Sequence, residues 1–262
     1  MPEYTGGEIQ TINAGQTLAG PSTIANINST GQDAYARQLI VSNATVGTVN
    51  ISSGGTMFMR GADASAESIS VYGYYGLGNK QVNYNLGGRL WMSGGVVNTL
   101  TLDNEGTCSM YGGTINNLIL SKTSTSVMSS VKLYIYGGTV LGGYNAANAG
   151  AKEIYASGGL VSNFTMNANA YIFASNGGCF KDCTFSGTWF AIRGGTAERV
   201  TFLNARNDSH NRMSTGLMSD CTIVAGASYA MIGGKAIGTI VSGANARFRV
   251  SGANAVMEGG TM

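Results

Sequence analysis

Short runs in which apolar and polar residues alternate recur along most of the chain, each beside a Gly-Gly pair. The run LWMSGGVVNTLTL from Leu90 is matched by CSMYGGTINNLIL from Cys108 and FAIRGGTAERVTF from Phe190. Apolar residues stand four and two positions before each pair and return two, five and seven positions after its second glycine. Alternation with a period of two is typical of a β-strand with one buried face. Each repeat therefore predicts two short strands joined at the glycines.

The Gly-Gly pairs also recur along the chain at similar intervals. Successive pairs begin at residues 94, 112, 137, 158, 177 and 194, so the repeat is close to 19 residues long. A strand of four or five residues cannot bury its apolar face alone, but repeats stacked in parallel place like residues over like at about 4.8 Å per coil. The sequence therefore predicts an all-β fold, a parallel β-helix (β-solenoid) with right-handed winding and about 12–13 coils of about 19 residues.

Some segments depart from the repeat. Residues 60–86, 121–131 and 204–215 each exceed it and predict excursions from the coil. The pattern is weaker before Gly54, so we expect residues 1–35 to form an irregular entry or cap and residues 36–262 the repeat domain. The sequence stops inside a repeat, which would leave unpaired backbone groups at the last coil. Either further chain or a second solenoid stacked end to end would cover them.

Composition excludes several classes of protein. Charged residues make up 11% of the chain and hydrophobic residues 44%, with 40 glycines and 2 prolines. Glycine does not recur every third residue, which excludes collagen, and the hydrophobic content argues against intrinsic disorder. The net charge of +2 and the lack of any Lys/Arg cluster predict no nucleic-acid partner. No window of 18 apolar residues occurs, which predicts no membrane insertion by this chain.

The cysteines predict neither a disulfide framework nor a metal site. Cys179 and Cys183 are separated by three residues, but no second pair of Cys or His follows to complete a zinc site. We expect these two thiols, with Cys108 and Cys221, to be buried packing residues. No cofactor is predicted.

Parallel β-helices also include polysaccharide lyases and hydrolases, whose chemistry needs acidic catalytic groups. Asp182, Glu198 and Asp220 would form a carboxylate column on one edge, where we interpret them as solvated corner charges rather than a glycosidase pair. The single histidine, His210, lies in the polar 204–215 segment with no nucleophile tied to it by a motif. The glycines also lack the spacing of a phosphate-binding loop. The sequence predicts a protein that is not an enzyme.

Aromatic residues at outward positions are the candidate contact face. They stand between or just after the inward residues that precede the Gly-Gly pairs, and amphipathic rings in a row suit sugar rings or the apolar surface of a partner. The alternative is that the rings stack on one another along the solenoid and only stabilise neighbouring coils. Tyr72, Tyr74 and Tyr75 would extend the stripe. The residues of the face are Trp91, Tyr111, Tyr134, Tyr136 and Tyr155.

A second outward column consists of threonine. An ordered row of hydroxyls would match an ice lattice, but the second threonine of each coil, which ice-binding solenoids generally have, is replaced by Asn167, Ser186, Leu203, Val224 and Val241. We therefore interpret the row as a ladder that favours β-structure. Its predicted members are Thr165, Thr184, Thr201, Thr222 and Thr239.

The repeats GGLVSNFTM (158–166), GGVVNTLTL (94–102) and SSGGTMFM (52–59) resemble those of AIDA-type autotransporter passengers, and the resemblance covers residues 40–262. It implies a β-helical stalk displayed outside Gram-negative bacteria for adhesion, aggregation or biofilm formation, with heptose on Ser or Thr in some members. The secretion signal and C-terminal translocator of that family do not occur in this sequence, and its 4 cysteines and 12 methionines are unusual for a passenger. These departures would fit an excised passenger piece, or a phage or filament protein with the same repeat.

The sequence thus predicts a noncatalytic structural or adhesive β-solenoid, located extracellularly on the bacterial cell surface. Its expected partners are glycans or cell-surface molecules, and further copies of itself by lateral or end-to-end association. One alternative is a filament or phage fibre subunit with end-to-end stacked solenoids. The other is a polysaccharide-processing β-helix enzyme.

Overall fold

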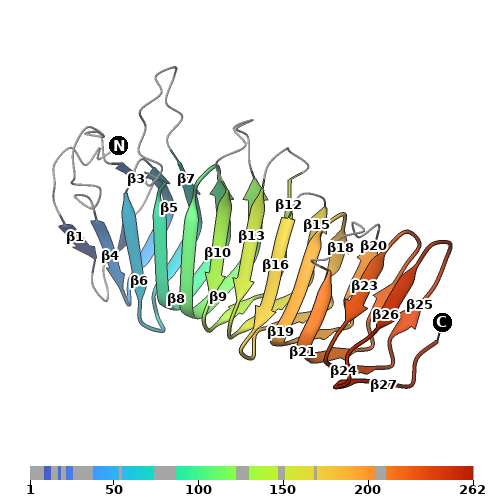
Figure 1. Cartoon of the computed structure of the whole chain (residues 1–262). Helices are drawn as coiled ribbons and strands as arrows, with labels where there is room; N and C mark the ends of the chain where they lie inside the picture. Colours follow the sequence, from blue (N-terminus) through green and yellow to red (C-terminus); the bar gives the residue numbers. More distant parts are fainter. Residues whose placement is uncertain are drawn as a thin grey trace. The chain divides into compact units, whose positions relative to one another are not determined.

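The computed structural model of this chain describes residues 9–12, 17–18, 22–25, 38–52, 55–73, 87–121, 130–146, 151–167, 170–203 and 211–261. These residues form 27 short strands and no helix (Figure 1). The chain divides into two compact units: unit 1 is residues 1–134 with 148–152, and unit 2 is residues 135–147 with 153–262. The division falls within β10 (Val131–Ile135) and β13 (Lys152–Ala156).

Unit 1 is a stack of coils whose strands pair in parallel with the coils before and after. One stack contains β1 (Ile9–Ile12), β4 (Gln38–Ser42), β6 (Thr56–Arg60) and the first halves of β8 (Arg89–Asp103) and β9 (Thr107–Ser121). The other contains β2 (Thr17–Leu18), β3 (Ser22–Ala25), β5 (Thr45–Ser52), β7 (Ser65–Tyr72) and the second halves of β8 and β9. Three strands that fall within residues 1–35 therefore take part in the coils.

Unit 2 has three strand stacks, because each coil turns a second corner. The first contains β16 (Ala170–Ser175), the first halves of β19 (Trp189–Glu198) and β21 (Arg212–Ser219), β23 (Ser228–Met231) and β26 (Arg247–Val250). The second contains β11 (Thr139–Val140), β14 (Leu160–Ser162), β17 (Cys179–Lys181), the second halves of β19 and β21, β24 (Gly234–Ile237) and β27 (Ala255–Glu258). The third contains β12 (Gly143–Asn145), β15 (Phe164–Asn167), β18 (Thr184–Ser186), β20 (Thr201–Leu203), β22 (Thr222–Ile223) and β25 (Ile240–Val241).

The alternation of the sequence places like residues over like in the core. In unit 1, Met59 pairs with Met92 and Met92 with Met110, and all three side chains are fully buried. In unit 2, a cluster of buried rings fills the coils, with centroids 5.1–6.1 Å apart. Burial of each such side chain contributes about 1.5–3 kcal/mol, so these ladders hold the coils together. The rings of the cluster are Phe180, Phe185, Phe190, Phe202 and Tyr229.

The structure confirms the parallel β-solenoid and its spacing of about 19 residues, as in the pairing of Thr165 with Thr184. It holds about ten turns, fewer than the predicted 12–13, because the estimate counted every residue as coil. Ser65 pairs with Val96, so 31 residues separate equivalent positions there. The segments 74–86, 122–129 and 204–210, which cover most of the predicted excursions, lie outside the described residues. The handedness of the winding stays a prediction.

Candidate functional site

The predicted aromatic face is part of two separate sets of stacked rings. In unit 1 the rings of Trp91 on β8 and Tyr111 on β9 are 5.9 Å apart and almost parallel, and Phe58 on β6 stacks on Trp91 at 6.3 Å. Trp91 and Tyr111 are 37% and 51% exposed, whereas Phe58 is half-buried. This row of three rings, Phe58, Trp91 and Tyr111, is called the unit 1 ladder below.

The other predicted face residues belong to β10, β13 and the turn between β10 and β11. Tyr134 is part of unit 1, and Tyr136 and Tyr155 are part of unit 2. Tyr136 is 49% exposed, and Tyr134 and Tyr155 are half-buried. Tyr155 stacks on Phe173 of β16 with ring centroids 4.8 Å apart and an interplanar angle of 1°. Its hydroxyl donates a hydrogen bond to Glu153 Oε2 at 2.7 Å.

Four further outward aromatic residues were not predicted from the sequence: Phe58, Tyr171, Phe173 and Trp189. Tyr171 and Trp189 pair in register, and their rings stack at 4.2 Å. The signal was the alternation in β16, AYIFAS, in which Tyr171 and Phe173 face outward. The repeat pattern predicted Phe173 to face the core, four positions before the Gly-Gly pair. This coil has one extra residue before the pair, so that Ile172 and Ala174 face the core instead.

Stacked rings of this kind present their edges to the solvent. Interplanar angles of 25° or less mean that neighbouring rings cover one another's faces along the stack. The structure thus shows the ring stacking, which stabilises each pair by about 0.5–1.5 kcal/mol. A role as a contact face stays a prediction. An incoming ring can stack face to face only where a ladder is interrupted.

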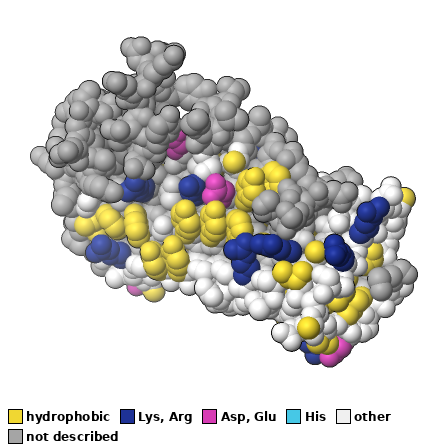
Figure 2. Space-filling model, viewed as in Figure 1, with side chains coloured by type: hydrophobic (Ala, Val, Ile, Leu, Met, Phe, Trp, Pro, Cys, Tyr) yellow, Lys and Arg dark blue, Asp and Glu magenta, His cyan; other side chains and the backbone are white. Residues whose placement is uncertain are grey.

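One interruption is found in unit 2, where a small residue replaces a ring. Phe173 pairs with Ala191, and Ala191 pairs with Arg212. Trp189 and Arg193 flank Ala191 on the same strand, and the Arg193 guanidinium carbon lies 5.7 Å from the Phe173 ring centroid. Arg193 thus lies over the Phe173 ring, and Ala191 is only 5% exposed. What is left beside them is a small surface cavity of about 10 Å³, room for a single water, lined by Tyr171, Ile172, Phe173, Trp189, Ala191, Arg193 and Arg212. Figure 2 shows hydrophobic and basic side chains gathered on one face of the molecule.

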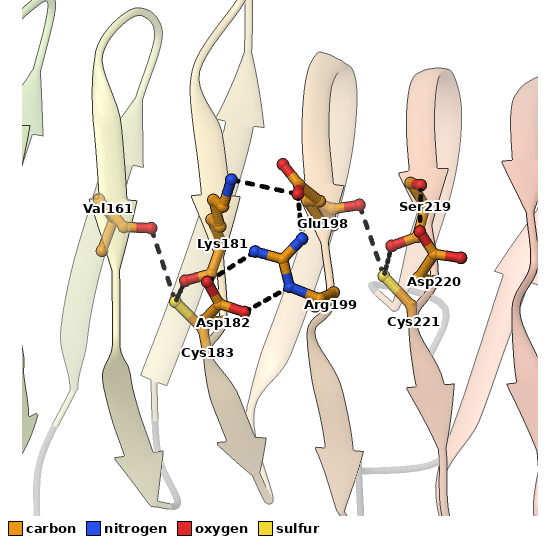
Figure 3. A network of polar contacts seen from close by, with 10 residues as sticks. Val161, Lys181, Asp182, Cys183, Glu198, Arg199, Ser219, Asp220 and Cys221 are labelled. Carbon is orange, nitrogen blue, oxygen red and sulfur yellow. Dashed lines mark hydrogen bonds and ion pairs between the residues drawn. The ribbon is translucent and has the colours of Figure 1, made fainter.

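The predicted carboxylate column forms a charged network at a corner of unit 2 (Figure 3). Arg199 binds Asp182 with both ends of its fork, Nε to Oδ1 at 2.6 Å and Nη2 to Oδ2 at 2.9 Å, and its Nη1 contacts Glu198. Lys181 Nζ lies 3.2 Å from Glu198 Oε1. Asp220, on the next coil, accepts a hydrogen bond from Ser219 Oγ at 2.9 Å.

This network holds its carboxylates ionised. The hydrogen bond from Arg199 lowers the pKa of Asp182, and that from Lys181 lowers the pKa of Glu198, with Arg199 lowering it further. A general acid for glycoside hydrolysis needs a raised pKa, so neither group suits that role at neutral pH. These side chains are exposed ion pairs at a corner, which agrees with the interpretation as corner charges.

The corner itself is built from residues with positive φ. Asn163, Asp182, Arg199 and Asp220 have φ of 51°, 53°, 51° and 52°, and Gly238 continues the column with 60°. Each of the first four donates its backbone N–H to a carbonyl on the next coil. Asn and Asp tolerate this conformation better than other residues with a Cβ. The side chain of Arg199 does not favour a positive φ, and its ion pairs to Asp182 and Glu198 offset part of the strain.

The cysteines are packing residues at and beside the coils. Cys108, Cys183 and Cys221 are buried, and burial raises the pKa of each thiol to about 12. Cys183 Sγ donates to Val161 O at 3.6 Å and Cys221 Sγ to Ala197 O at 3.5 Å. Cys179 is half-buried. All four are free thiols, and no cluster of His, Cys, Asp or Glu within the described part of the chain would hold a metal ion.

Four of the five predicted threonines form a row across neighbouring strands. Thr165, Thr184, Thr201 and Thr222 pair in succession. Thr222 then pairs with Ile240, not with Thr239. Thr239 is fully buried because it directly follows the corner glycine Gly238, so its side chain points inward. The prediction of Thr239 as the fifth member was therefore wrong by one position, because Ile240 takes that place in the row.

Two other predicted elements lie outside the described residues. They are His210 with residues 204–210 of its polar segment, and Tyr74 and Tyr75 of the aromatic stripe. Tyr72 ends β7, where it is half-buried. In the part of the chain that is described, no helix is both long and apolar enough to cross a membrane.

Comparison with known proteins gave one similar structure. A crystal structure of a TibA fragment, residues 55–350, hyper-glycosylated by TibC, has a TM-score of 0.41 and 17% sequence identity to this chain, and the match covers 95% of this chain and 97% of that one. No protein-family model matches the chain. No curated protein matches it either.

Proposed function

We propose that this chain is a noncatalytic structural and adhesive module displayed on the bacterial cell surface, and that the unit 1 ladder is a contact surface. The observation that carries the proposal is the exposure of large rings on a rigid parallel sheet. Trp91 and Tyr111 are 37% and 51% exposed, and they stack on each other with Phe58 in one row. Exposed aromatic residues that are held rigid in this way are typical of contact sites, because they gain buried area at small entropic cost.

Two further features support this function. The Gly-Gly repeats resemble those of AIDA-type passengers, which favours surface display and contacts with glycans or other cells. The charged network at the corner of unit 2 consists of ionised carboxylates bound by Lys181 and Arg199, which favours a structural role for it over general acid catalysis.

The adhesive role is tested by removing two rings of the ladder. We expect the double variant Trp91→Ser/Tyr111→Ser to lose most binding to bacterial or epithelial cells while keeping the circular dichroism spectrum of the wild type. Stacking of about 0.5–1.5 kcal/mol per pair is too small to decide folding. Tyr144→Ser is the matched control, because Tyr144 is 48% exposed but lies in the third strand stack of unit 2. Unchanged adhesion in the double variant would reject this surface.

The noncatalytic assignment has its own test. Purified protein incubated with a panel of polysaccharides should release no reducing sugar and no unsaturated product. Release that disappears in Asp182→Asn or Asp220→Asn would contradict the assignment and favour a polysaccharide-processing enzyme.

A further inference from the structure

We propose that the outward face of the first strand stack of unit 2 binds an extended sulfated polysaccharide through four arginines, called the arginine field below. The field consists of Arg193, Arg212, Arg247 and Arg249. This inference rests on the proposed adhesive function for its biological sense, and it adds a class of ligand and a second contact surface.

The coils bring together arginines that are far apart in the sequence. Arg193 lies on β19, Arg212 begins β21, and the other two lie on β26. Arg212 pairs with Ala230, and Ala230 pairs with Arg249, so these two arginines share one column two coils apart. From β19 to β26 the field spans three strand spacings, or about 14 Å along the stack.

The arginine side chains point away from the core. Ile192 and Met213, which are the strand neighbours of Arg193 and Arg212, are fully buried, so the alternation of the strand places the arginines outward. Arg193, Arg247 and Arg249 are exposed, and Arg212 is half-buried. The guanidinium groups are therefore available at the surface of one sheet.

The positive charge of the field is not neutralised by the acidic side chains that the structure describes. None of the four arginines forms an ion pair with one of them. Three acids of unit 2 belong to the second strand stack or its corner and are bound by basic residues there, namely Asp182, Glu198 and Glu258. Asp220 lies at the same corner, and Glu153 is on β13, two strands before β19. The net charge of +2 for the whole chain thus conceals a basic face.

The shape of this face favours a ligand that is held by projecting charged groups. The cavity beside Ala191 has room for a single water, so no sugar ring is enclosed there. The neighbouring rings of Tyr171 and Trp189 cover each other's faces, and Arg193 lies over the ring of Phe173. Sulfate esters project from a polysaccharide on single bonds, and the guanidinium fork can donate two hydrogen bonds to such an oxyanion.

The density of charge favours a sulfated chain over the other polyanions. Four positive charges within about 14 Å match a polymer with several anions per repeat better than one with a single carboxylate per repeat. Single-stranded nucleic acids bind through stacking of their bases on aromatic faces, whereas the stacked rings beside the field present their edges. Nucleic acid is therefore the rival ligand that the test must exclude.

The test is a calorimetric titration of the full chain with a heparin dodecasaccharide at several salt concentrations. One comparison ligand is the same oligosaccharide after desulfation and N-acetylation, which keeps its carboxylates, and the other is a thymidylate 12-mer. We expect saturable heparin binding, with a slope of about −2 to −4 for the logarithm of the binding constant against the logarithm of the salt concentration. Both comparison ligands should bind at least about tenfold more weakly. Equal or tighter binding of either, or a slope near zero, would overturn the assignment.

Variants matched in charge locate the site. Arg212→Gln/Arg249→Gln removes two charges from the field, and Lys181→Gln/Lys235→Gln removes two from the second strand stack of the same unit. We expect the first variant to weaken heparin binding about tenfold or more and to reduce the salt slope by about 2, and the second to change neither appreciably. Circular dichroism verifies that both fold.

Two outcomes would contradict this location. Equal losses of affinity in the two variants would mean that only net charge matters, and wild-type affinity in Arg212→Gln/Arg249→Gln would mean that the field does not bind the ligand. If that variant does not fold, Arg193→Gln/Arg247→Gln removes the other two charges of the field and is judged by the same criteria.

The result is separable from the test of the proposed function. A chain that binds heparin through the arginine field but adheres to no cell refutes the adhesive role and leaves this site intact. A chain whose adhesion depends on Trp91 and Tyr111 but that binds no heparin refutes the site alone.

Discussion

At the scale of single residues, the second corner of the unit 2 coils from β14 onward depends on one position. The residue there has a positive φ and a side chain that determines how much strain the turn carries. Asn163, Asp182 and Asp220 are suited to it, and Gly238 has no strain at all. Arg199 is the exception, and its bidentate contact with Asp182 ties two adjacent coils together.

This contact predicts a pH dependence. The folded pKa values of Asp182 and Glu198 are lowered, so the stability that they contribute is complete above their unfolded pKa of about 4 and is lost as the pH falls through the folded values. In low salt, we expect the Tm of the wild type to fall between pH 7 and pH 2.5 by about 1–2 °C more than that of Lys181→Gln/Arg199→Gln. Arg247→Gln is the control for loss of a surface charge. An equal fall in the wild type and the double variant would mean that the network adds nothing to stability.

The thiols predict a pattern of chemical labelling. Burial raises the pKa of Cys108, Cys183 and Cys221 to about 12, whereas Cys179 is half-buried. We expect only Cys179 to react with iodoacetamide in the folded protein at pH 8.5, and slowly, because its pKa is also raised. Mass spectrometry of the digested protein would identify the labelled site, and Cys179→Ser should remove it. Rapid labelling of any buried thiol would contradict the packing described.

At the scale of the strand and its corner, the two glycines of the pair Gly177-Gly178 have different roles. Gly177 has a φ of +92° and open space around it, so glycine is there for its conformation. Gly178 has no unusual φ, but a Cβ there would overlap the carbonyl oxygen of Ala156 on the coil before. The second glycine is therefore required because the backbones approach closely.

This difference is testable with two matched substitutions. Gly177→Ala should lower the free energy of unfolding by about 1–2 kcal/mol, the cost of a Cβ in the left-handed region. Gly178→Ala should lower it by more, about 2–4 kcal/mol, because a backbone must move. Urea unfolding followed by tyrosine and tryptophan fluorescence would give both values. The reverse order would show that conformation, not space, determines the second glycine.

Alternation in the sequence was sufficient to predict the parallel stacking and the inward residues. Leu90, Met92, Phe190 and Ile192 are fully buried as expected. The third strand stack was missed, although its signal was present. Apolar positions two and five after the Gly-Gly pair differ by three residues, and that break in a period of two is the corner at which Arg199 and its equivalents turn the chain.

The candidate site was less predictable than the fold. Outward positions were recognised from the alternation, but which rings touch depends on the register between coils. One extra residue before Gly177 turns Phe173 outward, where it stacks on Tyr155 and is covered by the guanidinium of Arg193. These contacts become visible only when the coils are aligned.

At the scale of the whole molecule, each coil of a unit contacts mainly the coils beside it. Stability in such a chain is approximately a sum of contributions from coils and from the interfaces between neighbours. A defect in the core of one coil should therefore loosen its neighbours first and distant coils of the same unit least.

Hydrogen exchange would measure this decay. Phe190→Ala removes a fully buried ring and should cost about 3–5 kcal/mol locally. In unit 2, we expect faster exchange in β16, β19 and β21 and little change in β26. In unit 1, Leu90→Ala is the matched case, with the largest effect expected in β6, β8 and β9. A uniform increase over all strands of a unit would indicate that it unfolds as one cooperative body.

The pairing of β7 with β8 has a practical consequence. Thr45 pairs with Ser65 after 20 residues, and Ser65 pairs with Val96 after 31, yet the register on both sides is the same. The length of the chain between two paired strands therefore does not affect the register in which they pair. A guest peptide grafted between these two strands would be carried without disturbing the scaffold, which makes this protein a ready vehicle for presenting epitopes.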